Sequence, residues 1–224
     1  MKIVLVATSA SKLKSHDTGL WIHELASPYY EFVEKGDYEI TIASPAGGAV
    51  PIDAGSMAEG FFNDECKKFM HDPIAIGKLS HSVKLTDIDW EPVDAIFMTG
   101  GHGTCTDFVG QPSLKSAIET MYNSGKVVAA VCHGVLALAD CELEDGTSLV
   151  KGKKVTGFSD SEEEAVQLSK IVPFLLETKL KELGANYSKG SDWGAHVVTD
   201  GKLITGQNPQ SADDVARAVI EMLS

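Results

Sequence analysis

The feature that most constrains this chain is a series of short apolar runs that alternate with segments of helical periodicity. Continuous apolar strands separated by helices predict an α/β fold, with a mainly parallel sheet sandwiched between helices. The expected strands are Lys2–Thr8, Tyr38–Ser44, Ala95–Thr99, Val127–Val131, Lys154–Gly157, His196–Thr199 and Leu203–Thr205. The expected helices are Gly19–Glu34, Ser56–Met70, Pro112–Ser124, Gly134–Cys141, Glu162–Ile171, Pro173–Leu183 and Ser211–Leu223.

The C-terminal part of the pattern departs from simple alternation. Two strand-like runs, Val197–Thr199 and Leu203–Thr205, flank Asp200-Gly201, which is a turn dipeptide typical of β-hairpins. We therefore expect one antiparallel pair near the C-terminal end of the sheet.

Composition narrows the class of partner. The 224 residues are 43% hydrophobic and carry a formal net charge of −13, with a pI near 4.9. Such a charge argues against nucleic acid or an anionic membrane as partner, because a polyanion would be repelled. No apolar segment approaches the roughly 20 residues that span a bilayer, and no linker or repeat divides the chain. We expect one domain, residues 1–224, in the cytoplasm.

The most informative short motif is Ala129-Ala130-Val131-Cys132-His133-Gly134. Ligands of parallel sheets bind beyond the carboxyl ends of the strands, where Cys132 stands. The small residues Ala130 and Gly134 suit a sharp turn that lifts one side chain out of the sheet, as in a nucleophile elbow with cysteine in place of serine. The next helix is expected to favour the thiolate, and the His133 amide to face an oxyanion. The alternative is that Cys132 is a small buried hydrophobic residue.

A second motif, Thr99-Gly100-Gly101-His102-Gly103-Thr104, also follows an apolar run. Glycines at a strand end allow a ligand to approach the backbone closely and leave N–H donors free. The spacing fits neither common phosphate-binding glycine pattern. A simple turn is the alternative to a binding loop.

The remaining cysteines and the histidines suggest no metal. Cys66, Cys105 and Cys141 show no C-x-x-C spacing with Cys132, so free thiols are expected. Only Cys105, close to the glycine loop, is considered as a secondary redox partner. The seven histidines lack H-x-x-x-H or similar spacing. We predict neither a catalytic metal nor an organic cofactor.

Taken together, the motifs resemble the ThiJ/PfpI superfamily, whose flavodoxin-like domain is similar to the class I glutamine amidotransferases. Within it, the chain is most similar to the branch of heat-shock chaperones and glutathione-independent glyoxalases (glyoxalase III). Five segments in the same order carry this resemblance over essentially the whole chain. They are Thr18-Gly19 with Trp21-Ile22-His23-Glu24, Gly101–Thr104, Ala129–Gly134, Thr156-Gly157-Phe158-Ser159-Asp160, and Thr199-Asp200-Gly201 with Thr205-Gly206-Gln207-Asn208-Pro209.

The resemblance implies roles for individual residues. Cys132 matches the nucleophile, His133 the triad histidine, and Glu24 a buried acid that contacts the sulfur. Gly101 and His133 match the amides of an oxyanion hole, and His102 lies where it could contact substrate. Glu163 is the nearest match to the triad acid.

Two questions stay open at this point. Neighbouring residues on a regular helix do not face each other, so Cys132 and His133 can cooperate only if the elbow backbone is bent. Glu162 and Glu164 flank Glu163, and the three could equally form a solvated acidic first turn of a helix.

The activity that the resemblance implies is conversion of methylglyoxal to lactate without glutathione, of the D-lactate dehydratase type. Cys132 would form a hemithioacetal with the 2-oxoaldehyde, and His133 or Glu24 would move a proton through an enediol. The resemblance also implies a homodimer.

Two other classes of function compete with this one. The same site could serve a cysteine peptidase or amidase, or a protein deglycase. Alternatively, the chain could be a stress-response holdase chaperone with Cys132 as a redox sensor. Met57–Phe62 and Phe69-Met70 could supply the exposed apolar patch that a chaperone needs, although a core helix is the more common use of such residues.

Overall fold

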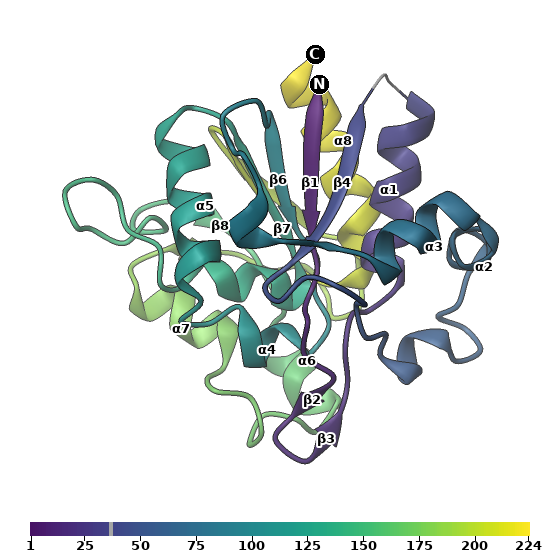
Figure 1. Ribbon diagram of the computed structural model, residues 1–224. Coiled ribbons are helices and arrows are strands. Elements are labelled where there is room, and N and C mark those ends of the chain that lie inside the picture. The colour runs from purple at the N-terminus through teal and green to yellow at the C-terminus, as the bar shows by residue number, and fades with distance from the viewer. Residues whose placement is uncertain (36–37) are drawn as a thin grey trace.

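A computed structural model describes residues 1–35 and 38–224, and a seven-stranded sheet runs through its centre (Figure 1). Six strands are parallel, and only β10 is antiparallel to its neighbour β11. The spatial order is β10 (Val197–Asp200), β11 (Leu203–Gly206), β7 (Val127–Val131), β6 (Ala95–Met98), β1 (Lys2–Val6), β4 (Glu39–Ser44) and β5 (Val83–Lys84). The predicted mainly parallel sheet and its antiparallel C-terminal pair are both confirmed.

Helices cover both faces of the sheet. On one face α1 (His23–Lys35) packs against α8 (Ala212–Leu223), and α8 also contacts β7 and β11. On the other face α5 (Pro112–Asn123) packs against β6 and β7. The central strands are buried on both sides, which explains why their sequences are continuously apolar rather than alternating.

The other elements are short. The α-helices are α2 (Asp64–His71), α3 (Pro73–Ser80), α4 (Thr104–Asp107), α6 (Asp160–Ala165) and α7 (Leu176–Glu182). The 3₁₀ helices are η1 (Ala54–Met57), η2 (Leu85–Asp87), η3 (Cys132–Leu138) and η4 (Pro209–Ser211). The strand pairs outside the main sheet are β2 (Lys12–Leu13) with β3 (His16–Asp17), and β8 (Lys154–Val155) with β9 (Asn186–Tyr187).

Several predicted elements differ from the structure. The strand expected at Lys154–Gly157 shortens to β8 and pairs with β9 instead of joining the main sheet. The helix expected at Ser56–Met70 is interrupted, because Gly60 adopts a φ of +92° and α2 then begins anew with Asn63 as its cap.

Three further helices are shorter than expected or of another type. The segment Gly134–Cys141 lies mainly in the 3₁₀ helix η3, which begins at Cys132 itself. The segment Glu162–Ile171 reduces to α6, which is followed by Gln167 at a φ of +63°. The helix expected from Pro173 begins only at Leu176.

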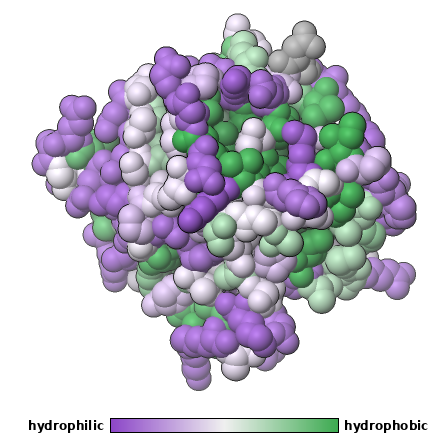
Figure 2. All heavy atoms as spheres, viewed as in Figure 1, coloured by the Kyte–Doolittle hydropathy of each residue, from purple (hydrophilic) through white to green (hydrophobic). Residues whose placement is uncertain are grey.

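The arrangement places the carboxyl ends of β1, β6 and β7 at one end of the molecule, together with α4 and α6, while both chain termini lie at the opposite end (Figure 1). The surface seen from the same direction carries many hydrophilic side chains, with hydrophobic ones gathered near the middle and to the right (Figure 2). No helix in the described ranges is long and apolar enough to cross a bilayer.

Candidate active site

Cys132 occupies a sharp bend between β7 and η3. Its φ is +55°, a left-handed conformation that costs a residue other than glycine about 1–2 kcal/mol. Gly134 leaves room for this bend, because a Cβ atom there would lie 2.4 Å from the carbonyl oxygen of Met98. The bend therefore depends on the small residue that the sequence places two positions after the cysteine.

The bend also allows adjacent side chains to meet. Sγ of Cys132 lies 3.4 Å from Nδ1 of His133. Nε2 of His133 lies 2.6 Å from Oε2 of Glu163, which is in α6. The structure thus brings together the thiol, the imidazole and the acid that the resemblance matched to a triad.

Glu163 is the only one of the three consecutive acids that contacts His133. Its other oxygen, Oε1, lies 2.9 Å from Nε2 of His102. Glu164 is exposed. Glu162 is buried but caps α6, where its carboxylate accepts hydrogen bonds from the amide and hydroxyl of Ser159. The alternative of a solvated acidic turn therefore holds for Glu164 but not for Glu162 or Glu163.

The charges of Glu163 and His133 follow from their surroundings. Burial acts to raise the pKa of Glu163, but His133 and His102 outweigh it and hold that pKa well below its ordinary value. Burial, helped by neighbouring His102, lowers the pKa of His133 although Glu163 opposes the shift. A neutral imidazole that donates from Nε2 to a carboxylate leaves Nδ1 unprotonated and facing the sulfur.

Glu24 approaches the sulfur from the first turn of α1. Its side chain is fully buried, and Oε2 accepts a hydrogen bond of 2.8 Å from the amide of Gly100. Burial raises the pKa of Glu24 to about 8, against the opposing effects of Cys132 and of the Gly100 amide. Its second oxygen, Oε1, is buried without a hydrogen-bonded nitrogen or oxygen partner in residues 1–35 and 38–224.

The ionisation of Cys132 differs from the sequence-based expectation. Burial, followed by the Glu24 carboxylate, raises the pKa of this thiol well above its ordinary value. The His133 amide, at the start of η3, acts to lower this pKa as expected of a helix N-terminus, but burial outweighs it. The resting thiol therefore keeps its proton and needs a neighbouring base.

The glycine loop after β6 lies directly beside the elbow. Gly101 has a φ of +94°, and a Cβ there would meet the carbonyl oxygen of Gly19 at 2.3 Å. The hydroxyl of Thr104 donates to the carbonyl oxygens of Gly101 and His133, which ties the loop to the elbow. The His133 amide acts on the thiol as a hydrogen-bond donor. The predicted oxyanion amides, of Gly101 and His133, thus belong to two connected segments.

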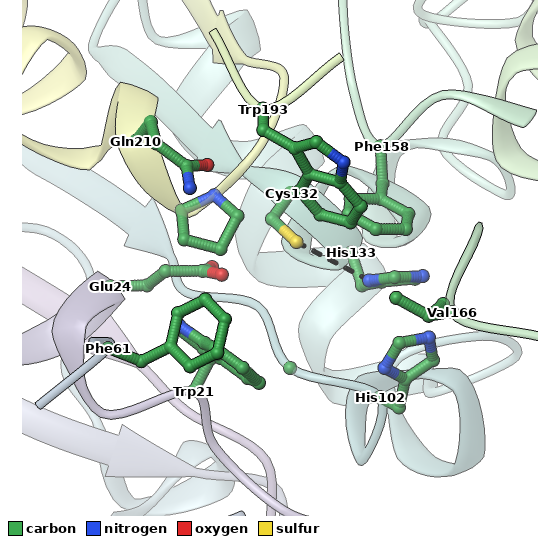
Figure 3. A pocket seen from close by; sticks show the side chains of 12 residues that line it. Trp21, Glu24, Phe61, His102, Cys132, His133, Phe158, Val166, Trp193 and Gln210 are labelled. Carbon is green, nitrogen blue, oxygen red and sulfur yellow. Dashed lines mark hydrogen bonds between the residues drawn. The ribbon is translucent and has the colours of Figure 1, made fainter. Parts of the chain in front are cut away.

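A cavity of about 360 Å³ opens over Cys132, and its walls are mainly aromatic (Figure 3). Trp21 and Phe61 stand on one side of the sulfur, with Phe158 and Trp193 on the other. Trp193 is a site residue that was not predicted from the sequence. The available signal was a large apolar side chain within a polar loop, Ser191-Asp192-Trp193-Gly194.

One group of side chains could bind a metal ion. Ligand atoms of His102, His133 and Glu163 all lie within 4.8 Å of one another. Both imidazoles already hydrogen-bond to the carboxylate, so an ion here would replace the contacts that orient His133. The other three thiols, Cys66, Cys105 and Cys141, are buried and unpaired. Burial raises the pKa of each of these thiols.

The fold and site define an α/β protein with a cysteine nucleophile elbow at the carboxyl edge of a parallel sheet. The DJ-1/PfpI family pattern matches residues 19–222, and the chain belongs to this family. The resemblance inferred from sequence is thereby confirmed.

Named relatives place the chain within one branch of the family. It is 33% identical to "Glyoxalase 3" of Candida albicans, covering 98% of this chain and 97% of that protein. It is 30% identical to "Glutathione-independent glyoxalase HSP31" of Saccharomyces cerevisiae, covering 99% and 98%. The crystal structure of Rapid Encystment Protein 24 kDa of Francisella tularensis superimposes with a TM-score of 0.95 at 39% identity, covering 100% and 99%.

Proposed function

We propose that this chain is a glutathione-independent glyoxalase, an enzyme that converts methylglyoxal and water into lactate. The predicted activity is the one in the names of the relatives from Candida albicans and Saccharomyces cerevisiae. One observation carries the proposal: Cys132, His133 and Glu163 form a hydrogen-bonded series beneath an apolar cavity, with Glu24 beside the sulfur.

The first step is attack of sulfur on the aldehyde carbon. Cys132 and Glu24 form a buried pair that together must lose one proton before a thiolate can exist. Once Glu24 is ionised, its carboxylate accepts the thiol proton while the sulfur–carbon bond forms. The aldehyde oxygen becomes an alkoxide, which the Gly101 and His133 amides stabilise, and Glu24 then returns the proton to this oxygen to give a hemithioacetal.

The second step moves a proton between neighbouring carbons. Nδ1 of His133, held unprotonated by the Nε2 contact to Glu163, takes the proton from the former aldehyde carbon. The resulting enediol is reprotonated at the adjacent carbon, which gives a thioester of the 2-hydroxy acid. Water then cleaves the sulfur–carbon bond, releasing lactate and restoring the thiol. The net reaction converts methylglyoxal and water into lactic acid and needs no external oxidant or reductant.

The burial of the nucleophile favours a small carbonyl compound over a peptide. Cys132 is 3% exposed and lies at the base of the cavity, where an extended chain would have to displace the surrounding aromatic side chains. A panel of methylglyoxal, glyoxal and a peptide amide separates a glyoxalase from a peptidase or amidase. Suppression of aggregation by a Cys132→Ala protein would identify a holdase activity independent of this chemistry.

The test measures lactate formation from methylglyoxal without added glutathione. Mass spectrometry of the enzyme then looks for the covalent adduct on Cys132. Cys132→Ala is expected to lower turnover by at least about 10³-fold while circular dichroism stays unchanged. Cys66→Ala is the matched control, since it removes another buried thiol that lies in α2. Full turnover by Cys132→Ala would contradict the covalent mechanism.

The cytoplasmic location, the homodimer and the single-domain organisation stay predictions. Cell fractionation, light scattering and limited proteolysis, respectively, would test them. The mechanism above uses residues of one chain only.

A further inference from the structure

The cavity is larger and more apolar than methylglyoxal requires. Methylglyoxal has three carbons and two oxygens, and its only apolar group is a methyl. The cavity volume of about 360 Å³ lies in the range of pockets that hold much larger ligands. Glu24 and His133 adjoin the sulfur, and four aromatic side chains supply much of the remaining lining. This aromatic part faces whatever group the substrate carries beyond its two carbonyls.

Two pairs of aromatic side chains bound that space, and we name them the aromatic slot. Trp21 and Phe61 meet edge to face, with ring centroids 5.3 Å apart. The ring centroids of Phe158 and Trp193 lie 5.8 Å apart. The two pairs stand on opposite sides of the Cys132 sulfur (Figure 3). Phe158 also lies 4.4 Å from the His133 ring, so one wall of the slot is fixed relative to the reacting atoms.

The two side chains that form the outer walls of the slot, Phe61 and Trp193, are not buried in the core. Phe61 is 49% exposed and Trp193 is 42% exposed, although most large apolar side chains of this protein are buried. Exposed aromatic groups that converge on a cavity are typical of a binding surface.

The position of Trp193 is held by a buried network. Its φ is +61°, an unfavourable conformation for a bulky residue. The Trp193 amide donates a hydrogen bond of 2.9 Å to Oε1 of Glu162, and the same oxygen accepts one of 2.8 Å from Nδ2 of Asn208. Asn208 also donates to the carbonyl oxygen of Gly194. Buried polar groups thus stabilise a strained backbone whose indole stays half exposed over the cavity.

We propose that the preferred substrates are 2-oxoaldehydes whose remaining group is flat and apolar, such as an aryl group, and that this group lies in the aromatic slot. The inference rests on the proposed glyoxalase function and deepens it. The chemistry is unchanged: phenylglyoxal plus water gives mandelate, with the same sulfur–carbon bond made and broken. Trp193 and Phe61 are then specificity-determining residues, and Glu162 is a positioning residue that acts through Trp193.

The test compares phenylglyoxal with methylglyoxal in the wild-type enzyme. Burial of a phenyl ring against aromatic walls predicts a kcat/KM for phenylglyoxal about 10- to 100-fold higher. Trp193→Ala and Phe61→Leu are each expected to reduce this ratio about tenfold, chiefly through KM for phenylglyoxal. Ile74→Ala is the matched control, because it removes an exposed apolar side chain from α3, outside the cavity. Glu162→Gln should shift KM for phenylglyoxal in the same direction as Trp193→Ala.

A binding measurement makes the test independent of turnover. Cys132→Ala protein should bind mandelate at least about tenfold more tightly than lactate, and Trp193→Ala added to it should remove the difference. Turnover of methylglyoxal without a preference for phenylglyoxal would overturn the aromatic slot and leave the proposed function standing. A preference that survives both slot substitutions would also overturn it. Failure to convert either compound would overturn the glyoxalase proposal together with this inference.

Discussion

Nε2 of His133 lies 2.6 Å from Oε2 of Glu163, and this contact decides which nitrogen of the imidazole can act as a base. A carboxylate at Nε2 keeps the proton there and leaves Nδ1 facing Cys132. His102 donates to the other oxygen of the same carboxylate, so two imidazoles fix its orientation. In the proposed mechanism Glu163 orients the histidine without itself exchanging protons.

Substitution of Glu163 tests this assignment. Glu163→Gln keeps the shape of the side chain but offers His133 an amide, which can stabilise the wrong tautomer. We expect kcat for methylglyoxal to fall by about 10²- to 10⁴-fold with a smaller change in KM. Glu164→Gln, at the exposed neighbouring position, is the control and should keep wild-type kinetics. Equal kinetics in both variants would remove Glu163 from the mechanism.

Glu24 should determine the pH dependence of sulfur attack. Its pKa is raised to about 8 by burial, and the Cys132 pKa is also raised, so the pair holds both protons at neutral pH. Attack requires loss of one proton, and kcat/KM should therefore increase as the pH rises through about 8. Glu24→Gln removes the proton acceptor, which should lower turnover at pH 7 by about 10²-fold or more and move the rise to higher pH.

A pH–rate profile of the two proteins, measured between pH 6 and pH 10 by lactate formation, checks this expectation. The control is Glu34→Gln, which alters an exposed carboxylate on the same helix. A wild-type profile that is flat through pH 8 would show that the pair loses its proton elsewhere in the titration.

The elbow and its sheet could be predicted from sequence because both rest on local patterns. β7 has the predicted bounds of Val127–Val131, and the turn at Asp200-Gly201 joins the predicted antiparallel pair. An apolar run or a turn dipeptide determines the structure of a few neighbouring residues, so both can be recognised without knowing which distant segments they contact.

Other features depended on contacts between distant segments. The thiol pKa is governed by burial and by Glu24, which lies over 100 positions before Cys132 in the sequence. The strand β8 leaves the main sheet because its partner is β9, and no local pattern specifies that choice. Trp193 reaches the cavity through a hydrogen bond to Glu162, and the sequence interval between them carries no motif.

The buried Glu24 should also make the folded protein less stable as pH rises. Its pKa increases from an ordinary value of 4.5 to about 8 on folding, so the folded state binds more protons than the unfolded state between these pH values. The stabilising contribution is fully present below pH 4.5 and is lost as pH rises through about 8. Relative to wild type, Glu24→Gln should gain a few kcal/mol of unfolding free energy between pH 5 and pH 9. Urea unfolding at both pH values measures this difference, and a constant difference would contradict a buried, protonated Glu24.

Metal ions should inhibit this site rather than support it. The proposed steps use only side chains and backbone amides, so EDTA should leave the turnover of methylglyoxal unchanged. Added Zn²⁺ should lower turnover, because His102, His133 and Glu163 place their ligand atoms within 4.8 Å of one another and coordination would pull His133 out of its catalytic orientation. EDTA should then restore the rate.

The His102→Gln variant, which lacks one of the three ligands, tests the site of inhibition. Half-inhibition of this variant should need a Zn²⁺ concentration at least about 10-fold higher than half-inhibition of wild type. Loss of wild-type activity on treatment with EDTA, recovered by adding a divalent metal, would instead mean that a metal ion takes part in the reaction.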